Sequence, residues 1–195
     1  MADHTPRQEL LVSVLVLIAL ALPALIFALF GEDAVQALRY ERAAMTEGGW
    51  WRGLAAHWVH LGNTHLALNL AGLAVVVLIG GQWLGGGGLL LATLLGMVAV
   101  PLGLYVLDTQ IAWYVGLSGL THAIWAAASL RGILAYRSVV AWGFLALLAI
   151  KIIAEIQAGA SPALAQLVGG DVIVQSHWYG AAGGVLAAVL LPRHP

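Results

Sequence analysis

Long apolar stretches separated by short polar segments dominate this chain. Six of them are candidate membrane-spanning segments, at residues 10–30, 64–84, 89–107, 116–130, 138–156 and 172–191. About 20 consecutive apolar residues in a helix cross the hydrocarbon core of a bilayer. The pattern therefore predicts an all-α membrane protein. We expect one domain over residues 1–195, a bundle of six transmembrane helices with one long polar loop at 31–63.

The fourth apolar segment is the shortest, with 15 residues between Gly116 and Leu130. At about 1.5 Å per residue, a helix of that length cannot cross roughly 30 Å of hydrocarbon. Its start is therefore expected below one membrane surface. Irregular backbone is tolerated there only against protein or a water-filled cavity. The residues that open this segment are thus predicted to lie at the foot of a pocket.

The first apolar segment, residues 10–30, has a competing interpretation as a cleaved signal peptide. The apolar region of a signal peptide is shorter, about 7–15 residues, and follows a positively charged stretch. Segment 10–30 is 21 residues long, and the tail before it lacks a clear run of positive charge. We therefore expect it to be retained as a transmembrane helix.

Two further stretches carry no predicted chemistry. Loop 31–63 contains three tryptophans, which are typical of chain at the level of the lipid headgroups. Residues 35–45 could form a short amphipathic helix on that surface, or the whole stretch could be a solvated loop. Glycines 85–88 predict a flexible turn and lack the Lys-Ser/Thr pair of a phosphate-binding loop, so no nucleotide partner is expected.

Composition supports a membrane protein and excludes several classes of function. The chain is 62% hydrophobic and 9% charged, whereas soluble domains are about a quarter charged. A net charge of -1 argues against a nucleic-acid partner. There are no cysteines, which excludes disulfides, thiolate metal sites and a cysteine nucleophile.

Six spans would place both termini on one side of the membrane. Basic residues do not settle which side this is, because four fall on each side. Because the number of spans is even, the helix starts that carry four polar residues lie on the side opposite the termini. These residues are His65, Asn69, Ser118 and His177. Polar residues within membrane spans are costly and by default mark function. Their matching depth predicts one shared site.

Ser118 is the candidate nucleophile. Gly116 and Gly119 flank it and leave room for a substrate backbone to approach. Free N–H groups at a helix start point outward and favour negative charge, as an oxyanion site requires. A serine hydroxyl also needs a base within about 3 Å. The alternative is that Ser118 only caps its helix.

His177 is the candidate base. It shares a helical face with Gly180 and Gly184, at spacings of three and seven residues. Two small residues four apart let a neighbouring helix pack very closely. Burial on such a face favours the neutral imidazole that a general base requires. The alternative is a histidine bonded to a backbone carbonyl.

His65 and Asn69 share a face and could each donate a hydrogen bond to a developing oxyanion, or simply join helices. His122 lies one turn after Ser118 and could orient His177, stack on it or reach Ser118. A metal site would draw on His60, His65, His122 and His177. We expect no metal, because carboxylates near the site are missing from the spans and the pair His65/Asn69 offers only one imidazole. Lys151 and Glu155 are predicted to form an exposed ion pair.

The ordered set of these motifs resembles the rhomboid intramembrane serine proteases. It comprises His65-x-x-x-Asn69, Gly116-Leu117-Ser118-Gly119 and His177-x-x-Gly180-x-x-x-Gly184, with Trp51-Arg52 and His60 upstream, within residues 10–191. The resemblance implies Ser118 as nucleophile and His177 as base, with His65, Asn69 and the Ser118 N–H binding the oxyanion. It implies no metal or cofactor. It also implies a bacterial inner-membrane protein with cytoplasmic termini and a site open to the periplasm.

His122 departs from the family pattern, because many rhomboids carry an aromatic residue there, often tyrosine. A histidine at this place, in a compact six-span chain, is similar to the rhombosortase branch. That branch is thought to cleave secreted clients whose C-terminal tail has Gly-Gly, an apolar segment and basic residues. The expected partners are therefore such tails or other transmembrane segments, together with membrane lipids.

Three functions remain open at this stage. The first is an intramembrane protease, of the rhombosortase or a general type, that transfers an acyl group to Ser118 and then to water or an amine. The second is a catalytically silent rhomboid-like protein that binds membrane segments. The third is a proton or metal transporter that uses the histidines, and the lack of intramembrane carboxylates argues against it.

Overall fold

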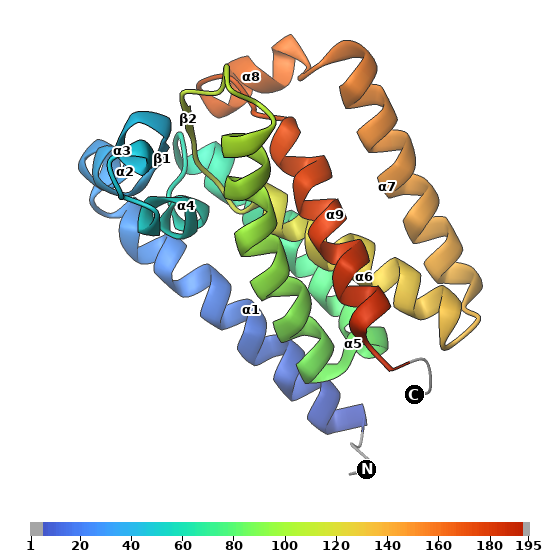
Figure 1. Cartoon of the computed structure of the whole chain (residues 1–195). Coiled ribbons are helices and arrows are strands. Elements are labelled where there is room, and N and C mark those ends of the chain that lie inside the picture. Colours follow the sequence, from blue (N-terminus) through green and yellow to red (C-terminus); the bar gives the residue numbers. More distant parts are fainter. Residues whose placement is uncertain (1–5, 193–195) are drawn as a thin grey trace.

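The computed structural model describes residues 6–192 and is helical apart from one pair of two-residue strands (Figure 1). The helices are α1 (Pro6–Ala28), α2 (Gly31–Leu38), α3 (Arg42–Thr46), α4 (Trp51–Ala55), the 3-10 turn η1 (Ala56–Trp58), α5 (Asn63–Val106), α6 (Ser118–Leu134), α7 (Val139–Ala158), α8 (Pro162–Val168) and α9 (Gln175–Leu190). Strands β1 (Tyr40–Glu41) and β2 (Trp113–Tyr114) pair antiparallel. The prediction of an all-α membrane protein is confirmed in its class.

Helix α5 consists of two arms. The backbone leaves helical geometry at Gly85, with φ 63° and ψ 178°, a conformation that favours glycine. The arms, 63–84 and 86–106, correspond to the predicted segments 64–84 and 89–107. The predicted turn of four glycines is too long, because glycines 86–88 are already helical and only Gly85 turns the chain.

Three described helices are long and apolar enough to cross a membrane: α1 from Leu10, α5 and α7. Helix α6 has 17 residues and α9 has 16, fewer than the roughly 20 of a straight crossing. The six-span count and the immersion of the start of α6 therefore stay predictions. The helix that contains the predicted fourth segment extends beyond residue 130. Helix α6 continues to Leu134, and the largely buried Arg131 is stabilised by donating to the Pro192 carbonyl.

Helix α6 lies at the centre of the bundle, between the arms of α5 and α9, with α1 and α7 at opposite edges (Figure 1). Glycines bring α6 and α9 into backbone contact. A Cβ at Gly180 would lie 1.9 Å from the Gly119 carbonyl oxygen, and one at Gly184 would lie 2.0 Å from that of Ala123. The predicted close packing on this face of α9 is therefore confirmed.

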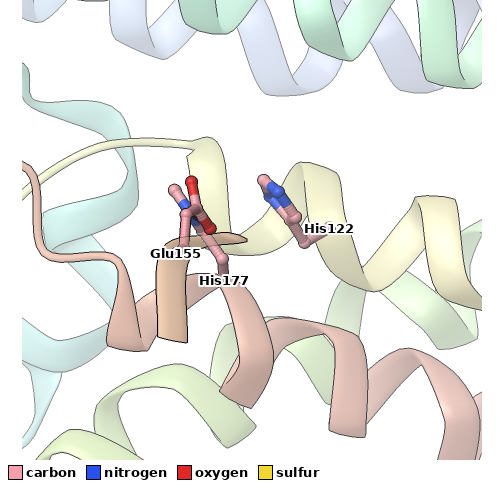
Figure 2. A group of neighbouring side chains, drawn as sticks. All are labelled: His122, Glu155 and His177. Atoms are coloured by element: carbon pink, nitrogen blue, oxygen red, sulfur yellow. Dashed lines mark hydrogen bonds and ion pairs between the residues drawn. The ribbon is translucent and has the colours of Figure 1, made fainter. Parts of the chain in front are cut away.

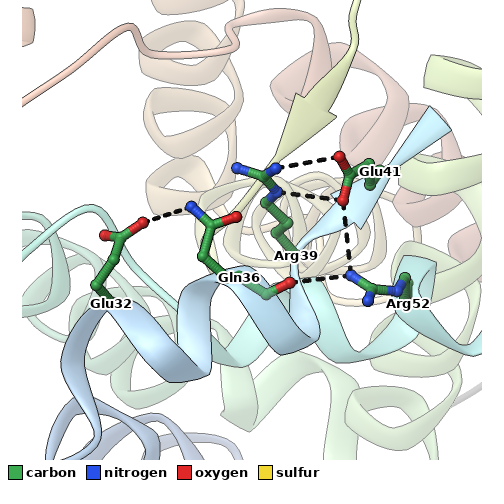
Figure 3. Close-up of polar contacts among 5 residues, drawn as sticks. All are labelled: Glu32, Gln36, Arg39, Glu41 and Arg52. Carbon is green, nitrogen blue, oxygen red and sulfur yellow. Dashed lines mark hydrogen bonds and ion pairs between the residues drawn. The ribbon is translucent and has the colours of Figure 1, made fainter. Parts of the chain in front are cut away.

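Loop 31–63 is built of short helices and one strand. The predicted amphipathic helix over 35–45 is wrong, because α2 ends at Leu38 and β1 then pairs with β2, with Tyr40 opposite Tyr114. Figure 3 shows polar contacts that hold this region: Glu41 accepts from Arg39 at 3.1 Å and pairs with Arg52 at 3.8 Å. Strand β2 leads directly into α6, so the pairing fixes how the chain enters that helix.

Arg42 connects the same region to the end of α5. Its guanidinium donates to the carbonyls of Tyr105 and Asp108, each at 2.9 Å, and to that of Leu104. These carbonyls belong to or follow the last turn of α5, where backbone acceptors lack partners within the helix.

Two further differences from the predicted elements lie after α7. Helix α8 was not predicted, and α9 begins at Gln175, later than the predicted residue 172.

Candidate active site

Ser118 is the first residue of α6. The residue at the capping position is Leu117, and no side-chain cap bond forms there, so the alternative of a simple helix cap does not account for Ser118. Gly116 has φ 116°, which other residues rarely adopt, and a Cβ there would lie 3.0 Å from the His65 ring. The Tyr114 hydroxyl donates to the Gly116 carbonyl at 2.5 Å. The approach to Ser118 is therefore fixed by tight contacts.

Two cavities meet at Ser118. One has a volume of 460 Å³ and is lined by residues of α5, α6, α7, α8 and α9, mostly apolar. The other has a volume of 230 Å³ and lies among the loops, beside β2 and the chain before α9. Ser118, His65 and Val172 line both. A partly exposed serine thus faces an apolar cavity among the helices on one side and a more polar one on the other.

The larger cavity gathers five of the predicted site residues: His65, Asn69, Ser118, His122 and His177. The structure therefore places the four polar residues predicted to share one site, and His122 with them, around one cavity. Their roles stay predictions. In the part of the chain that the structure describes, no hydrogen bond joins Ser118 Oγ to His177. In enzymes without substrate such catalytic hydrogen bonds are often long and tighten only in the complex. The two side chains therefore share a cavity and are not yet engaged.

His65 has a defined tautomer. The Leu61 N–H donates to His65 Nδ1 at 3.3 Å, which leaves the proton on Nε2, beside Gly116. Asn69 Nδ2 donates to the His65 carbonyl at 2.9 Å and keeps its second proton free to donate elsewhere. His65 Nε2–H and this amide proton can both serve as donors to an oxygen in the cavity.

His60 lies beside the site and lines neither of the two cavities that meet at Ser118. Its Nε2 accepts from the Leu117 N–H at 3.4 Å, and its ring contacts that of His65 edge to face at 5.1 Å. Burial, and secondarily the neighbouring His65, lowers the pKa of His60 to about 3. His60 therefore stays neutral near pH 7 and can keep accepting the bond that holds the residue before Ser118.

His177 is held between two side chains (Figure 2). Its ring stacks on that of His122, with centroids 4.1 Å apart and planes at 11°. Its Nδ1 lies 2.7 Å from Glu155 Oε2, and Glu155 also accepts from Lys151. His122 in turn donates from Nδ1 to the Ser118 carbonyl at 2.7 Å. Of the three predicted roles of His122, the geometry shows the stack on His177 and a contact with Ser118 through its backbone carbonyl.

Glu155 corrects two predictions. The Lys151–Glu155 pair exists, but the Glu155 side chain is only 12% exposed and points at His177, so the pair is not a plain exposed one. The expectation that the spans lack carboxylates near the site is also wrong, since Glu155 lies on α7. The spacing of Lys151 and Glu155 was visible in the sequence. The direction of Glu155 depends on where α7, which packs on α6, places its last turns relative to α9, and spacing does not reveal that.

The possible metal ligands in the structure are a different set from the four histidines considered from the sequence. Among the described residues, the group that could converge is His122, Glu155 and His177, whose ligand atoms lie within 4.8 Å of one another. Imidazole lone pairs lie in the ring plane, and these two rings are nearly parallel and stacked. Their lone pairs therefore do not point to a common centre, and the arrangement fits a metal poorly. The expectation of no metal remains a prediction.

Fold and site together define a helical membrane protein with a serine, several histidines and a carboxylate gathered around one cavity. A family model, the Rhomboid domain, matches residues 47–194. That is most of the chain, and the protein belongs to the rhomboid family, whose members are intramembrane serine proteases. Helix α1 and the first part of loop 31–63 precede the matched region. A search of curated proteins finds no match to this chain.

Proposed function

We propose that this protein is an intramembrane serine endopeptidase in which Ser118 is the nucleophile and His177 the general base. The observation that carries the proposal is the position of Ser118, where an apolar cavity among the helices meets a second cavity among the loops. The first can receive an unwound stretch of a substrate's membrane segment. The second gives water a route to the same hydroxyl.

The reaction runs in two steps. Ser118 Oγ attacks the scissile carbonyl carbon, and its proton passes to His177 Nε2. As the C–N bond breaks, His177 gives that proton to the nitrogen of the leaving amine. A water, or an amine in a transferase reaction, next attacks the acyl ester and gives a proton to His177. The C–O bond to Ser118 breaks and the proton returns to Ser118 Oγ.

The negative charge that develops on the carbonyl oxygen needs donors that are already in place. The Ser118 N–H lies in the first turn of α6, where backbone donors lack partners within the helix. His65 Nε2–H and the free proton of Asn69 face the same cavity. We assign these three groups to the oxyanion. Gly116 and Gly119 keep side chains out of this space, and Gly180 and Gly184 hold α9 against α6.

For the client we propose a secreted protein with a C-terminal membrane-anchoring tail of the Gly-Gly type, as in the rhombosortase branch. The support is His122, whose ring stacks on His177 where many rhomboids carry tyrosine. Glycines make the unwinding that exposes a scissile bond less costly. Other transmembrane segments are the second class of client. The proposed location is the bacterial inner membrane, with cytoplasmic termini, a site open to the periplasm, and no metal or cofactor.

A fluorophosphonate probe tests the proposal. It forms a covalent adduct with an activated serine, so we expect one adduct on the purified protein, mapped by mass spectrometry to the peptide that contains Ser118. Ser118→Ala and His177→Ala should both lose it. A wild-type protein that folds and takes no adduct would contradict the proposal and favour a silent rhomboid-like protein that binds membrane segments.

A further inference from the structure

Glu155 is the one carboxylate that touches the proposed catalytic pair among the described residues, and the two-residue mechanism above leaves it unused. It lies on α7, near the end of that helix, while His177 lies in the first turn of α9. Its Oε2 is 2.7 Å from His177 Nδ1, and both side chains are largely buried, with 12% and 4% exposed. A contact of this length between a carboxylate and an imidazole nitrogen is a strong hydrogen bond.

This contact fixes which ring nitrogen of His177 carries the proton. An ionised carboxylate can only accept, so Nδ1 must donate and the lone pair is left on Nε2. A general base needs that lone pair on the side of the nucleophile. Lys151 donates to the other oxygen of Glu155, so Oε2 is left to accept from His177. The stack with His122 also fixes the orientation of the His177 ring plane, through contact with one face of the ring.

We propose that Glu155 is a positioning residue for His177, so that the site works as a Ser118–His177–Glu155 triad instead of a pair. The inference rests on the proposed function, because it assigns Glu155 a part in the same reaction. Glu155 holds the proton on Nδ1 while Nε2 accepts the proton of Ser118. Its negative charge then stabilises the positively charged ring until Nε2 passes the proton to the leaving amine. Glu155 itself exchanges no proton.

The alternative is that Glu155 only ties α7 to α9. Three substitutions separate the two roles. Glutamine has nearly the same size and can still bond to His177, so a mere tie tolerates Glu155→Gln better than Glu155→Ala. A positioning role predicts otherwise. The amide can donate to Nδ1, which places the ring proton on Nε2 and removes the lone pair facing Ser118. Glu155→Asp keeps the charge and should recover part of the rate.

The test uses the full-length protein in detergent micelles and the same fluorophosphonate. We expect the maximal rate of Ser118 labelling to fall roughly 10²–10⁴-fold in Glu155→Gln, as when the carboxylate of a serine protease triad becomes an amide. The probe concentration for half-maximal rate should change less than about threefold, because Glu155 acts on the chemical step and not on binding. Glu32→Gln is the matched control, an exposed glutamate bonded to Gln36 four residues along α2, and should label at the wild-type rate.

Nitrogen NMR of histidine-labelled protein provides a second readout that a structural tie does not move. The His177 signal is assigned by its loss in His177→Asn. Wild type should show the proton on Nδ1, and Glu155→Gln should show it on Nε2. If Glu155→Gln fails to fold, Glu155→Asp carries the test through its intermediate rate and unchanged tautomer.

The outcomes are distinct. Labelling that disappears in Ser118→Ala and His177→Ala but stays within twofold of wild type in Glu155→Gln would overturn the triad and leave the protease proposal standing. A graded loss with alanine worse than glutamine would also overturn it, in favour of a tie between helices. If wild type takes no adduct on Ser118, the proposed function itself fails.

Discussion

The contacts of α6 with α9 and with α7 show two different ways of placing a side chain at one site. Helix α9 meets α6 through glycines, with no room for even a methyl group at Gly180 or Gly184. Helix α7 packs mainly along α6, and most of its large apolar side chains are exposed. Nothing lies within 4 Å of a Cβ built on Gly143, in the second turn of α7.

The difference bears directly on the site. Ser118 and His177 come from the two helices in backbone contact, so their relative position is set by close packing, which tolerates little change. Glu155 comes from the loosely packed helix and reaches His177 through a polar contact. The positions of the nucleophile and the base are therefore fixed by close backbone packing of α6 and α9. The position of the carboxylate is fixed by its polar contact with His177. Substitutions in the two regions should fail in different ways.

The largest expected effect is on folding. Gly184→Ala places a methyl group 2.0 Å from the Ala123 carbonyl oxygen, so α9 must move away from α6. Overpacking of this kind costs about 1–3 kcal/mol or more. Gly143→Ala, the same change within α7, should leave stability unchanged or slightly raised. Thermal unfolding followed by helical circular dichroism in detergent compares the two variants. Equal melting temperatures would mean that the α6–α9 contact is not as tight as described.

Next come the proposed oxyanion donors on α5. His65→Ala and Asn69→Ala should each lower the maximal rate of client cleavage by about 10²-fold, because each removes one donor aimed at developing charge. The variants should melt close to wild type, since the α6–α9 contact is untouched. Gln82→Ala, an exposed residue of the same helix, serves as control. A rate loss matched by an equal loss of folded protein would point to a packing role instead.

The turn that leads into α5 should make stability depend on pH. Burial lowers the pKa of His57 to about 4 and that of His60 to about 3, both below the ordinary value near 6.5. Between these lowered pKa values and the ordinary value near 6.5, the unfolded chain therefore binds more protons than the folded one. Stability is full above about pH 6.5 and should fall below it, by at most about 1.4 kcal/mol per pH unit for each group.

His60→Gln tests the origin of that dependence. Glutamine can still accept from the Leu117 N–H but does not titrate in this range. Unfolding measured in detergent at pH 7.5, 6.5 and 5.5 should show a shallower loss of stability in the variant. A loss as steep as that of wild type would place its cause in other groups.

The smallest expected effect belongs to Lys151. Its side chain is 37% exposed, and ion pairs of that kind contribute about 0–1 kcal/mol. Lys151→Gln should therefore slow Ser118 labelling less than about fivefold, far less than Glu155→Gln. A loss as large as that of Glu155→Gln would mean that the charge state of Glu155 depends on Lys151 and that the polar link to α7 has two essential members.

Much of this could be predicted from sequence, and the reasons are local. Apolar length places α1, α7 and the arms of α5, because each contains a continuous apolar run. Gly180 and Gly184 predict the close contact of α9, because the spacing of small residues is itself the physical cause. The four polar residues predicted to share one site, His65, Asn69, Ser118 and His177, do line a single cavity.

What the sequence could not reveal depends on contacts between distant segments. Strand β1 is only two residues long and exists because β2, far along the chain, lies beside it. Arg131 reads as the end of a span, yet it is stabilised inside α6 by the Pro192 carbonyl. From the sequence, Glu155 is predicted to be half of a surface ion pair. Only the position of α7 relative to α9 directs it toward His177.

Cleavage of a client tests the central claim most directly. A secreted protein whose tail has Gly-Gly, an apolar span and basic residues is co-expressed with wild type or with Ser118→Ala, and its mass is measured. We predict cleavage near the glycines with wild type and an intact client with Ser118→Ala. An uncut client in both would remove the Gly-Gly specificity and turn the search to other transmembrane segments. A client cut equally by Ser118→Ala would contradict the account, because Ser118 would then not be the nucleophile.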